Sequence, residues 1–169
     1  MLEGLIKDFL LELQLTGRSD KTVEAYKYHL EKFAHFCKEN GYDFHAINGK
    51  ESRAFRNWLV DQGLKPASVN AIIAATKSFY DFLVEEEVVK GTPIISRRLR
   101  VAEGKSLPAF LTKTEERKIL SHLAALPYHV GLAFKTMLAS GLRVSEAAAL
   151  KAEDILVQQG VVFLVVTHG

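Results

Sequence analysis

The sequence predicts a mainly α-helical protein in which a four-helix domain is followed by a second segment of helices and a β-hairpin. Over the first 90 residues, apolar side chains recur at spacings of three and four, which is the period of a helix with one buried face. Glycine, proline and arginine then accumulate between residues 90 and 108. More helical segments follow, and after them two short apolar runs separated by a turn, which indicate a β-hairpin.

The four helices of the first domain have recognisable ends. The first is expected to end near Gly17, and the second to run from the N-cap candidate Ser19 to Gly41. A third is expected over residues 50–62, and a fourth begins at Pro66, because proline suits the first turn of a helix. The apolar stripes of these helices include Ile6, Phe9, Leu10, Leu13, Val23, Tyr26, Leu30, Phe33, Phe36, Phe55, Trp58, Leu59, Val69, Ile72, Ile73, Phe79, Tyr80 and Leu83. Four helices joined by short polar turns form a helical bundle.

The loss of periodicity after this bundle predicts a linker. We therefore expect a helical domain over residues 1–90, a basic linker over 91–108 and a second domain over 109–169. The linker contains a basic run with Arg97 and Arg98. Such a run is either a solvated tether or a strap that lies along a polyanion, because neutralised phosphates release counterions and thereby add affinity.

The second domain is expected to begin with a helix whose capping box is formed by Thr112 and Glu115. The remaining elements are expected as helices over residues 128–140 and 143–151, and as antiparallel strands over 155–157 and 161–166. The helix with the capping box carries the apolar residues Ile119, Leu120 and Leu123, and the helix over 128–140 is expected to pack through Val130, Phe134, Met137 and Leu138.

Composition excludes several classes of protein. The net charge of +2, from 22 basic and 20 acidic residues, does not by itself indicate a nucleic-acid partner. The single cysteine, Cys37, is expected in the core and excludes an internal disulfide framework, as suits a reducing cytosol. Apolar runs are too short to span a bilayer, and no two of the six histidines stand at metal-binding i, i+4 spacing.

Residues 139–146 contain the most chemical information. Gly141 permits a tight connection between two helices, and Arg143 then stands at the start of the second helix, where a cation opposes the helix dipole. Together with the N–H groups of that helix, Arg143 would form a phosphate-sized pocket. Glu146 can bond back to the helix start or hold the guanidinium in place. The residues alone leave open the alternative that Arg143 is a surface residue and Glu146 its capping partner.

Four segments resemble the tyrosine recombinases of the phage-integrase and Xer type. Residues 140–155, SGLRVSEAAALKAEDI, closely resemble the motif around the first catalytic arginine of that family. The pattern S-x-x-T-x-x-x-Y-x-x-x-L-x-x-F that begins at Ser19 resembles its core-binding, SAM-like domain. Residues 79–83 resemble the end of the fourth helix of that domain, and residues 108–112 resemble the entry to the catalytic domain. The resemblance covers the whole chain in collinear order.

The resemblance implies a C-shaped clamp around duplex DNA. In such enzymes a tyrosine attacks a DNA phosphodiester and forms a 3′-phosphotyrosyl link, with no metal or nucleotide cofactor. By motif position, Arg143 is the first of the arginines that stabilise charge on the phosphate oxygens, and Glu146 supports it. The implied partners are duplex DNA and other recombinase protomers, in a tetrameric synapse for the full-length protein, with no membrane. The implied location is the cytoplasm, in association with the nucleoid.

The residues expected to contact DNA stand on polar helix faces of the first domain and in the linker. They are Lys21, Thr22, Lys27, Ser68, Asn70, Lys77, Arg97, Arg98 and Arg100. Taken singly, each fits a solvated side chain better than a DNA contact. Taken as a set, they predict a basic track along the duplex.

The sequence also lacks part of the family pattern. The later signatures, which are a lysine, an H-x-x-R pair, a His or Trp and the nucleophilic tyrosine, would lie beyond Gly169, and all five tyrosines precede Arg143. The resemblance therefore implies the N-terminal part of a recombinase, in which residues 109–169 are the truncated start of an α+β catalytic domain and the chain is inactive by itself. Two alternatives stay open, namely a non-catalytic DNA-binding or regulatory protein on the same scaffold and a helical protein–protein adaptor. The target DNA, and the choice between chromosome-dimer resolution and phage or transposon integration, stay open as well.

The last strand is expected to have an unpaired apolar edge. Its apolar residues are Val161, Val162, Leu164 and Val166. Because such edges pair with other chains, dimerisation or an exchange of strands between protomers is expected for this chain.

Overall fold

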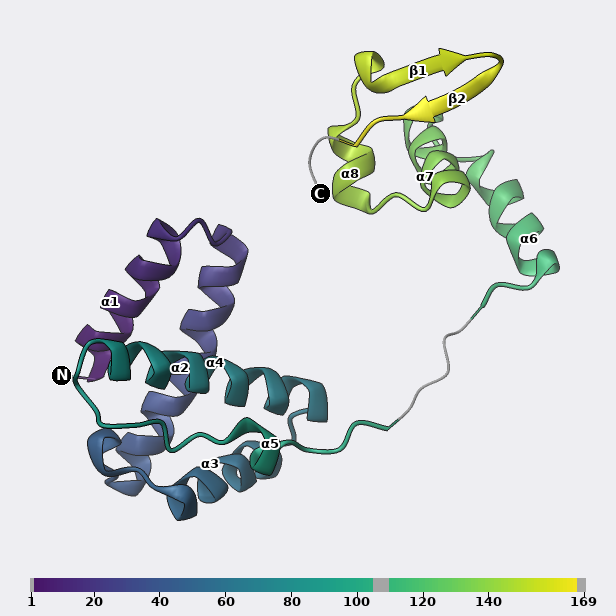
Figure 1. Cartoon of the computed structure of the whole chain (residues 1–169). Coiled ribbons are helices and arrows are strands. Elements are labelled where there is room, and N and C mark those ends of the chain that lie inside the picture. Colours follow the sequence, from purple (N-terminus) through teal and green to yellow (C-terminus); the bar gives the residue numbers. More distant parts are fainter. Residues whose placement is uncertain (1, 105–109, 167–169) are drawn as a thin grey trace. The chain divides into compact units, whose positions relative to one another are not determined.

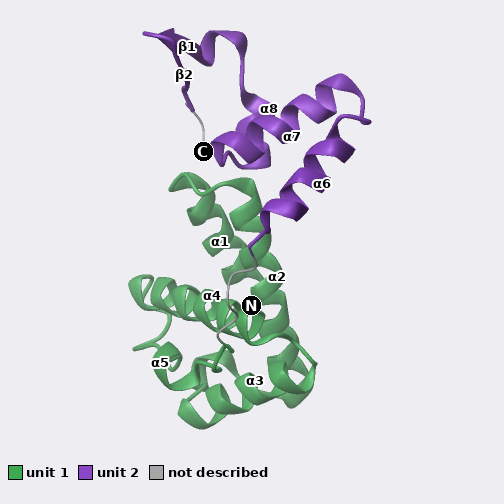
Figure 2. Cartoon of the chain, turned by 90° about the vertical axis from the view of Figure 1, so that its right-hand side faces the viewer, with its two compact units in different colours: residues 1–105 green, residues 106–169 purple. Residues whose placement is uncertain are grey.

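A computed structural model describes residues 2–104 and 110–166 of the chain (Figure 1). It divides into two compact units, residues 1–105 and residues 106–169 (Figure 2). Pro108 and Ala109, from the expected entry to the second domain, lie outside the described residues, as does Gly169. Within the described ranges, no helix is long and apolar enough to cross a membrane.

The first unit is a bundle of four long helices with two short ones. Their bounds are α1 (Leu2–Leu15), α2 (Asp20–Asn40), η1 (Phe44–Ala46), α3 (Gly49–Asp61), α4 (Pro66–Glu85) and α5 (Ser96–Leu99). The predicted helix ends are confirmed. Ser19 caps α2 by accepting a hydrogen bond from the Thr22 N–H, and Gly41 ends α2 in the left-handed region at φ 65°. Pro66 is the first residue of α4.

The core of this unit surrounds α4, which packs against α1, α2, α3 and α5. Phe33 lies beside Phe55 and Tyr80, with ring centroids 5.2 and 5.8 Å apart in edge-to-face geometry. The Tyr80 hydroxyl donates to the carbonyl oxygen of Phe44 at 2.8 Å, and burial raises the pKa of this phenol. Each such fully buried aromatic or aliphatic side chain contributes about 1.5–3 kcal/mol. The apolar stripes therefore converge on one core, as the sequence predicts.

Residues 91–104 pack on this bundle, whereas the sequence predicts a linker over 91–108. Ile94 and Leu99 are buried in the core of the first unit. The Ser52 hydroxyl on α3 donates to the carbonyl oxygen of Pro93 at 3.1 Å. Two apolar residues five positions apart produce no helical period, so the sequence did not reveal this packing. The basic run at Arg97 therefore belongs to a segment held against the first unit.

The described part of the second unit contains three α-helices, one short 3₁₀ helix and a hairpin. Their bounds are α6 (Lys113–Leu123), α7 (Tyr128–Ser140), α8 (Val144–Ala149), η2 (Ala152–Asp154), β1 (Ile155–Gln158) and β2 (Val161–Leu164). The capping box of Thr112 and Glu115 is present at the start of α6. The strands pair antiparallel with Ile155 opposite Leu164. Gln159 and Gly160 connect them with positive φ, as a two-residue type I′ turn requires.

Helix α7 crosses the end of α6 at Gly131. A Cβ atom built on this glycine would lie 2.6 Å from the carbonyl oxygen of Leu123. This distance is well inside van der Waals contact, so the two helices approach this closely only because residue 131 has no side chain. Gly131 and Leu123 are both buried.

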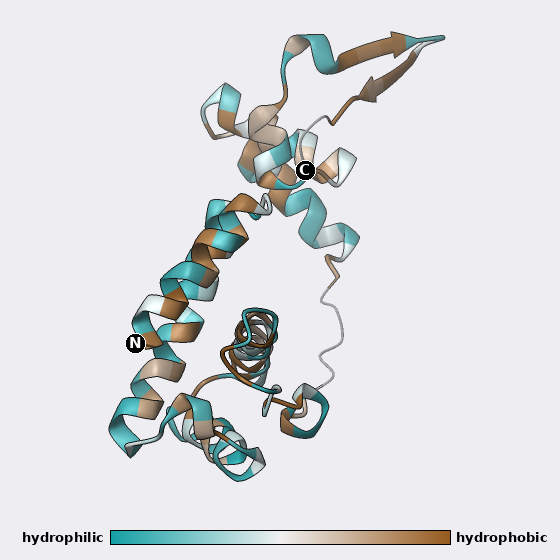
Figure 3. Ribbon diagram, turned by 60° about the vertical axis from the view of Figure 1, so that its left-hand side comes forward, coloured by the Kyte–Doolittle hydropathy of each residue, from teal (hydrophilic) through white to brown (hydrophobic). Residues whose placement is uncertain are grey.

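Most apolar side chains of the second unit are exposed, contrary to the packing that the sequence predicts for α7. Phe134 and Leu138 are 49% and 42% exposed, and Ile119 of α6 is 36% exposed. Figure 3 shows the hairpin strands as predominantly hydrophobic, while their residues lie at the surface apart from the half-buried Leu164. A periodic pattern identifies the apolar face of a helix, but what covers that face depends on residues that are remote in the sequence.

Candidate functional site

Helix α4 presents an outer face between α2 and α5 in the first unit. We define the α4 face as Ser68, Asn70, Ala71 and Ala74, all exposed or half-buried. Ala71 and Ala74 border a groove shared with α2, while Asn70 borders a second hollow shared with α5. The two hollows therefore flank the α4 face, and the candidate DNA-contact residues can be assigned to one side or the other.

The groove between α2 and α4 has an apolar floor and a polar end. Its volume is about 440 Å³, and its lining residues are Lys21, Thr22, Ala25, Tyr26, His29, Ala71, Ala74 and Ala75. The Thr22 hydroxyl lies 2.9 Å from that of Ser19, so the N-cap of α2 fixes its position. Burial lowers the pKa of His29, which favours the neutral imidazole. Lys21 and Thr22 thus stand beside methyl groups that project from α4.

The hollow on the other flank is basic, and we call it the arginine pocket. Its volume is about 320 Å³, and its lining residues are Asn70, Ile73, Ser96, Arg97 and Arg100. The Asn70 side chain accepts from the Val101 N–H at 2.8 Å and donates to the Val101 carbonyl oxygen at 3.0 Å. It also donates to Glu103 Oε1 at 2.7 Å. Asn70 therefore fastens the chain after α5 to α4, which the sequence did not suggest.

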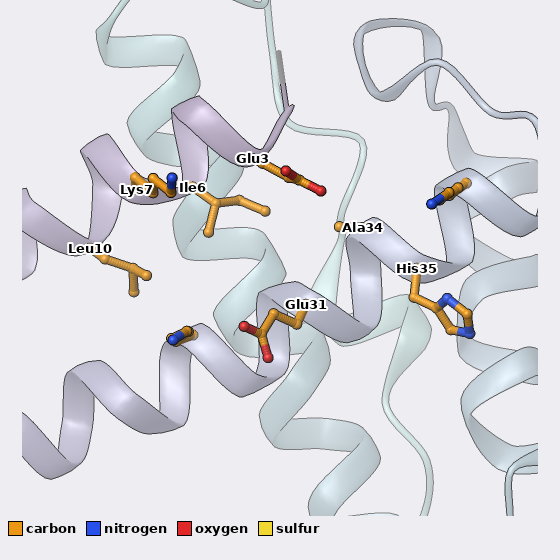
Figure 4. Close-up of a pocket in the computed structure, with 9 residues that line it drawn as sticks. Glu3, Ile6, Lys7, Leu10, Glu31, Ala34 and His35 are labelled. Carbon is orange, nitrogen blue, oxygen red and sulfur yellow. The ribbon is translucent and has the colours of Figure 1, made fainter.

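The other candidate residues are spread more widely than a single track. Lys27 lines a groove of about 400 Å³ between α1 and α2, where Ile6, Leu10 and Ala34 form an apolar floor among charged side chains (Figure 4). Lys77 forms an ion pair with Asp81 on α4. Ser68 and Arg98 are exposed. The structure thus brings together Lys21 and Thr22 in one group and Asn70, Arg97 and Arg100 in another, with Lys27 on a different side of α2.

In the second unit, Arg143 directly precedes α8 with extended backbone, at φ −70° and ψ 157°. Gly141 ends α7 in the left-handed region at φ 73°, which confirms the expected tight connection. Glu146 bonds twice to Arg143. Its Oε2 accepts from the Arg143 backbone N–H at 2.7 Å, and its Oε1 accepts from Nη1 at 2.7 Å. Both roles predicted for this carboxylate are therefore present at once.

This pair is asymmetric in exposure and charge. The Glu146 side chain is 9% exposed, whereas that of Arg143 is 80% exposed. The hydrogen bonds from the Arg143 backbone and side chain hold the pKa of Glu146 below its usual range, so the carboxylate stays charged. An anchored carboxylate thus orients a guanidinium whose other N–H donors face outward, which suits bidentate binding of an oxyanion.

Sequence reasoning missed Ser96, which lines the arginine pocket, and Glu103, which contacts two of its lining residues. Ser96 Oγ is buried and has no hydrogen-bond partner among the described residues. Glu103 accepts from Asn70 and lies 3.9 Å from the nearest Arg100 nitrogen. Contacts across 31 and 33 residues leave no local pattern that could have revealed them. The described residues also contain no group of three His, Cys, Asp or Glu side chains suited to a metal ion.

Known proteins match this chain at two levels: a family model matches the first unit, and individual relatives align with nearly the whole chain. Residues 6–87 match the family described as phage integrase, N-terminal SAM-like domain. The tyrosine recombinase XerC of Halalkalibacterium halodurans is 30% identical over 94% of this chain and 54% of its own length. The tyrosine recombinase XerA of Pyrococcus horikoshii is 33% identical over 98% of this chain and 52% of its own length.

Solved structures agree at the level of the fold. A lambda integrase (75–356) dimer bound to a COC′ core site matches 98% of this chain and 62% of its own chain, with a TM-score of 0.71 and 22% identity. A lambda integrase tetramer bound to a Holliday junction gives the same TM-score and identity, covering 50% of its own chain. The likeness shows that this chain has the fold of these integrase structures.

The first unit matches the phage-integrase SAM-like family, and over nine-tenths of the chain is similar to tyrosine recombinases, as its motifs predict. The chain spans about half the length of the curated relatives it matches.

Proposed function

We propose that this chain is the N-terminal part of a site-specific tyrosine recombinase that binds duplex DNA and, at full length, cuts and rejoins it through a 3′-phosphotyrosyl intermediate. In this proposal the first unit is the core-binding domain, and residues 109–169 begin the catalytic domain. The observation on which it rests is the doubly bonded pair of Arg143 and Glu146, in a chain of which over nine-tenths aligns with tyrosine recombinases.

The α4 face supports duplex DNA as the ligand of the first unit. Alanine methyl groups suit contact with thymine methyl groups in a major groove, and Ser68 supplies a hydroxyl beside them. Basic side chains stand on both flanks, with Lys21 on one and Arg97 and Arg100 on the other. Phosphate contacts at the flanks would position the protein on the duplex, and base contacts between them would recognise the sequence.

Arg143 is assigned the first catalytic arginine position. Its guanidinium would bind the non-bridging oxygens of the scissile phosphate, where negative charge grows as the tyrosine attacks. Glu146 acts through Arg143, because its two short hydrogen bonds fix both the backbone and the head group of that residue. A lysine has no planar fork and cannot reproduce this geometry.

The DNA-binding part of the proposal is tested by fluorescence anisotropy of residues 1–169 with a labelled duplex over a range of salt concentrations. We expect weak binding whose logarithm falls linearly with the logarithm of salt concentration. Binding that ignores salt would instead favour the helical adaptor, which has no DNA role.

The catalytic part is tested by trapping covalent adducts on nicked duplex. Residues 1–169 alone should form none, whereas a longer chain with the later family signatures should form a phosphotyrosyl adduct. In that longer chain, Arg143→Lys should abolish the adduct and leave DNA affinity nearly unchanged, with Lys151→Arg as a charge-conserving control. Near-normal turnover of the Arg143→Lys variant would refute the role assigned to this residue.

The non-catalytic DNA-binding or regulatory protein is separated by the same experiment. It predicts DNA binding together with no adduct from any natural extension of the chain. Under the leading proposal, further recombinase protomers are partners, in a tetrameric synapse at full length and as a strand-exchanged dimer of this chain. The proposed location is the cytoplasm, in association with the nucleoid. The dimer is tested by sedimentation, in which a concentration-independent monomer contradicts it.

A further inference from the structure

The arginine pocket combines two cationic side chains with a hydroxyl that lacks a partner. Arg97 and Arg100 line the same hollow of about 320 Å³ and are both exposed. Ser96 lines it as well, and its Oγ is buried with no hydrogen-bond partner within the part of the chain that the structure describes. A buried hydroxyl without a partner is costly, so its persistence points to a ligand that satisfies it.

One side of the arginine pocket is held in place by hydrogen bonds, and one of its arginines has a carboxylate nearby that another anion could replace. Asn70 bonds to both the N–H and the carbonyl of Val101, which holds the chain after Arg100 against α4. Glu103 Oε1 accepts from Asn70 at 2.7 Å and lies 3.9 Å from Arg100 Nη2. At 3.9 Å the ion pair is loose, and the side chains of Arg100 and Glu103 are 72% and 45% exposed, so little free energy opposes its replacement.

We propose that the arginine pocket binds a single backbone phosphate of duplex DNA, which accepts hydrogen bonds from Arg97, Arg100 and Ser96. In the absence of DNA, the carboxylate of Glu103 pairs with Arg100, and the phosphate replaces this carboxylate on binding. This inference rests on the proposed DNA-binding function and assigns one phosphate position within it. A phosphate oxygen fits the donor set, because guanidinium groups and hydroxyls bond oxyanions. Asn70 is a positioning residue in this arrangement.

The decisive measurement is the salt dependence of duplex binding by residues 1–169 and its variants. Each neutralised phosphate contributes about 0.9 to the slope of log affinity against log salt concentration. If Arg97 and Arg100 share one phosphate, Arg97→Gln, Arg100→Gln and the double variant should each lower the slope by at most about 1, with an affinity loss of about ten-fold in 0.1 M salt. The matched control is Arg53→Gln, an exposed arginine on α3 outside the pocket.

Ser96→Ala separates ligand binding from folding. Because Ser96 Oγ has no partner among the described residues, the variant should unfold at an equal or higher urea concentration. It should nevertheless bind duplex about ten-fold more weakly, with an unchanged salt slope, because a hydroxyl releases no counterion. Weaker binding accompanied by lower stability would indicate a structural role and overturn the assignment.

Glu103→Gln tests the exchange of carboxylate for phosphate. Glutamine keeps an oxygen for Asn70 and removes the charge beside Arg100, so duplex affinity should rise about two- to five-fold. Glu85→Gln, at an exposed position near the end of α4, is the control for a general loss of negative charge. An equal rise in both variants overturns the role of Glu103.

The possible results distinguish a failure of the pocket assignment from a failure of the proposed DNA-binding function on which it rests. If the parent chain shows no salt-dependent duplex binding, the proposed function fails. If the parent binds but the double arginine variant keeps its slope, only the pocket assignment fails. A slope reduced by about 2 in the double variant overturns the shared phosphate, because the two arginines then neutralise separate phosphates.

Discussion

Two glycine-to-alanine substitutions should change stability in opposite directions, although both lie in helices. Gly4 stands in α1 and a Cβ there meets nothing within 4 Å, whereas at Gly131 a Cβ would lie 2.6 Å from the Leu123 carbonyl oxygen. Alanine improves helix propensity by about 1 kcal/mol at either position. Gly4→Ala should therefore stabilise the first unit by up to about 1 kcal/mol.

At Gly131 the overlap outweighs the gain in propensity. The carbonyl oxygen belongs to the backbone at the end of α6, so it can retreat only if α6 and α7 move apart. Overpacking of this kind costs about 1–3 kcal/mol. After the gain of about 1 kcal/mol from propensity, Gly131→Ala should destabilise the second unit by up to about 2 kcal/mol.

The two units allow separate assays. The only tryptophan, Trp58, packs against the core of the first unit, so its fluorescence in urea reports on that unit. Amide hydrogen exchange in α6 and α7 reports on the second unit. We expect a higher urea midpoint for Gly4→Ala, and faster exchange in α6 and α7 with an unchanged tryptophan transition for Gly131→Ala. Slower exchange in the Gly131→Ala variant would refute the close approach.

Three further predictions follow from buried or hydrogen-bonded groups. Tyr80→Phe leaves the Phe44 carbonyl without its donor and should cost about 1–3 kcal/mol, seen as a lower urea midpoint of tryptophan fluorescence; an unchanged midpoint contradicts this. Burial, and secondarily Asp43, raises the pKa of Cys37 to about 12, so a thiol reagent at pH 8 should label this residue only after unfolding, and rapid labelling of the native chain would disprove its burial. Because its bonds to Arg143 lower the pKa of Glu146 in the folded chain, the stability they contribute is complete above the ordinary value of 4.5 and is lost as pH falls through the lower folded value. In an NMR titration, the Arg143 amide should shift with a midpoint below 4.5, and a midpoint at or above that value removes the basis for the pair.

The helix ends were predictable because their causes are local. Ser19 caps the turn that immediately follows it, and Gly41 ends the same helix because glycine adopts positive φ without strain. The bonds between Arg143 and Glu146 join residues three apart, so the motif alone contains both partners. Sequence reasoning reached that part of the candidate site for the same reason.

The arginine pocket could not be predicted, because its parts are remote in the chain. The polar helix face of Asn70 predicts a DNA contact, yet all its described hydrogen bonds go to Val101 and Glu103. The segment with Arg97 was expected as a linker, but Leu99 anchors it to the bundle. Neither contact has a period or spacing that a pattern search can detect.

Capping, periodicity and short spacing are sufficient to predict the helices, their ends, the family resemblance and the arginine motif. The tertiary structure was needed to show which polar side chains share a surface. It grouped Arg97 and Arg100 with Ser96, placed Lys27 in another groove, and left Phe134 exposed. The physical reason is that a helix face is a local property, whereas its neighbour is chosen by packing across the whole unit.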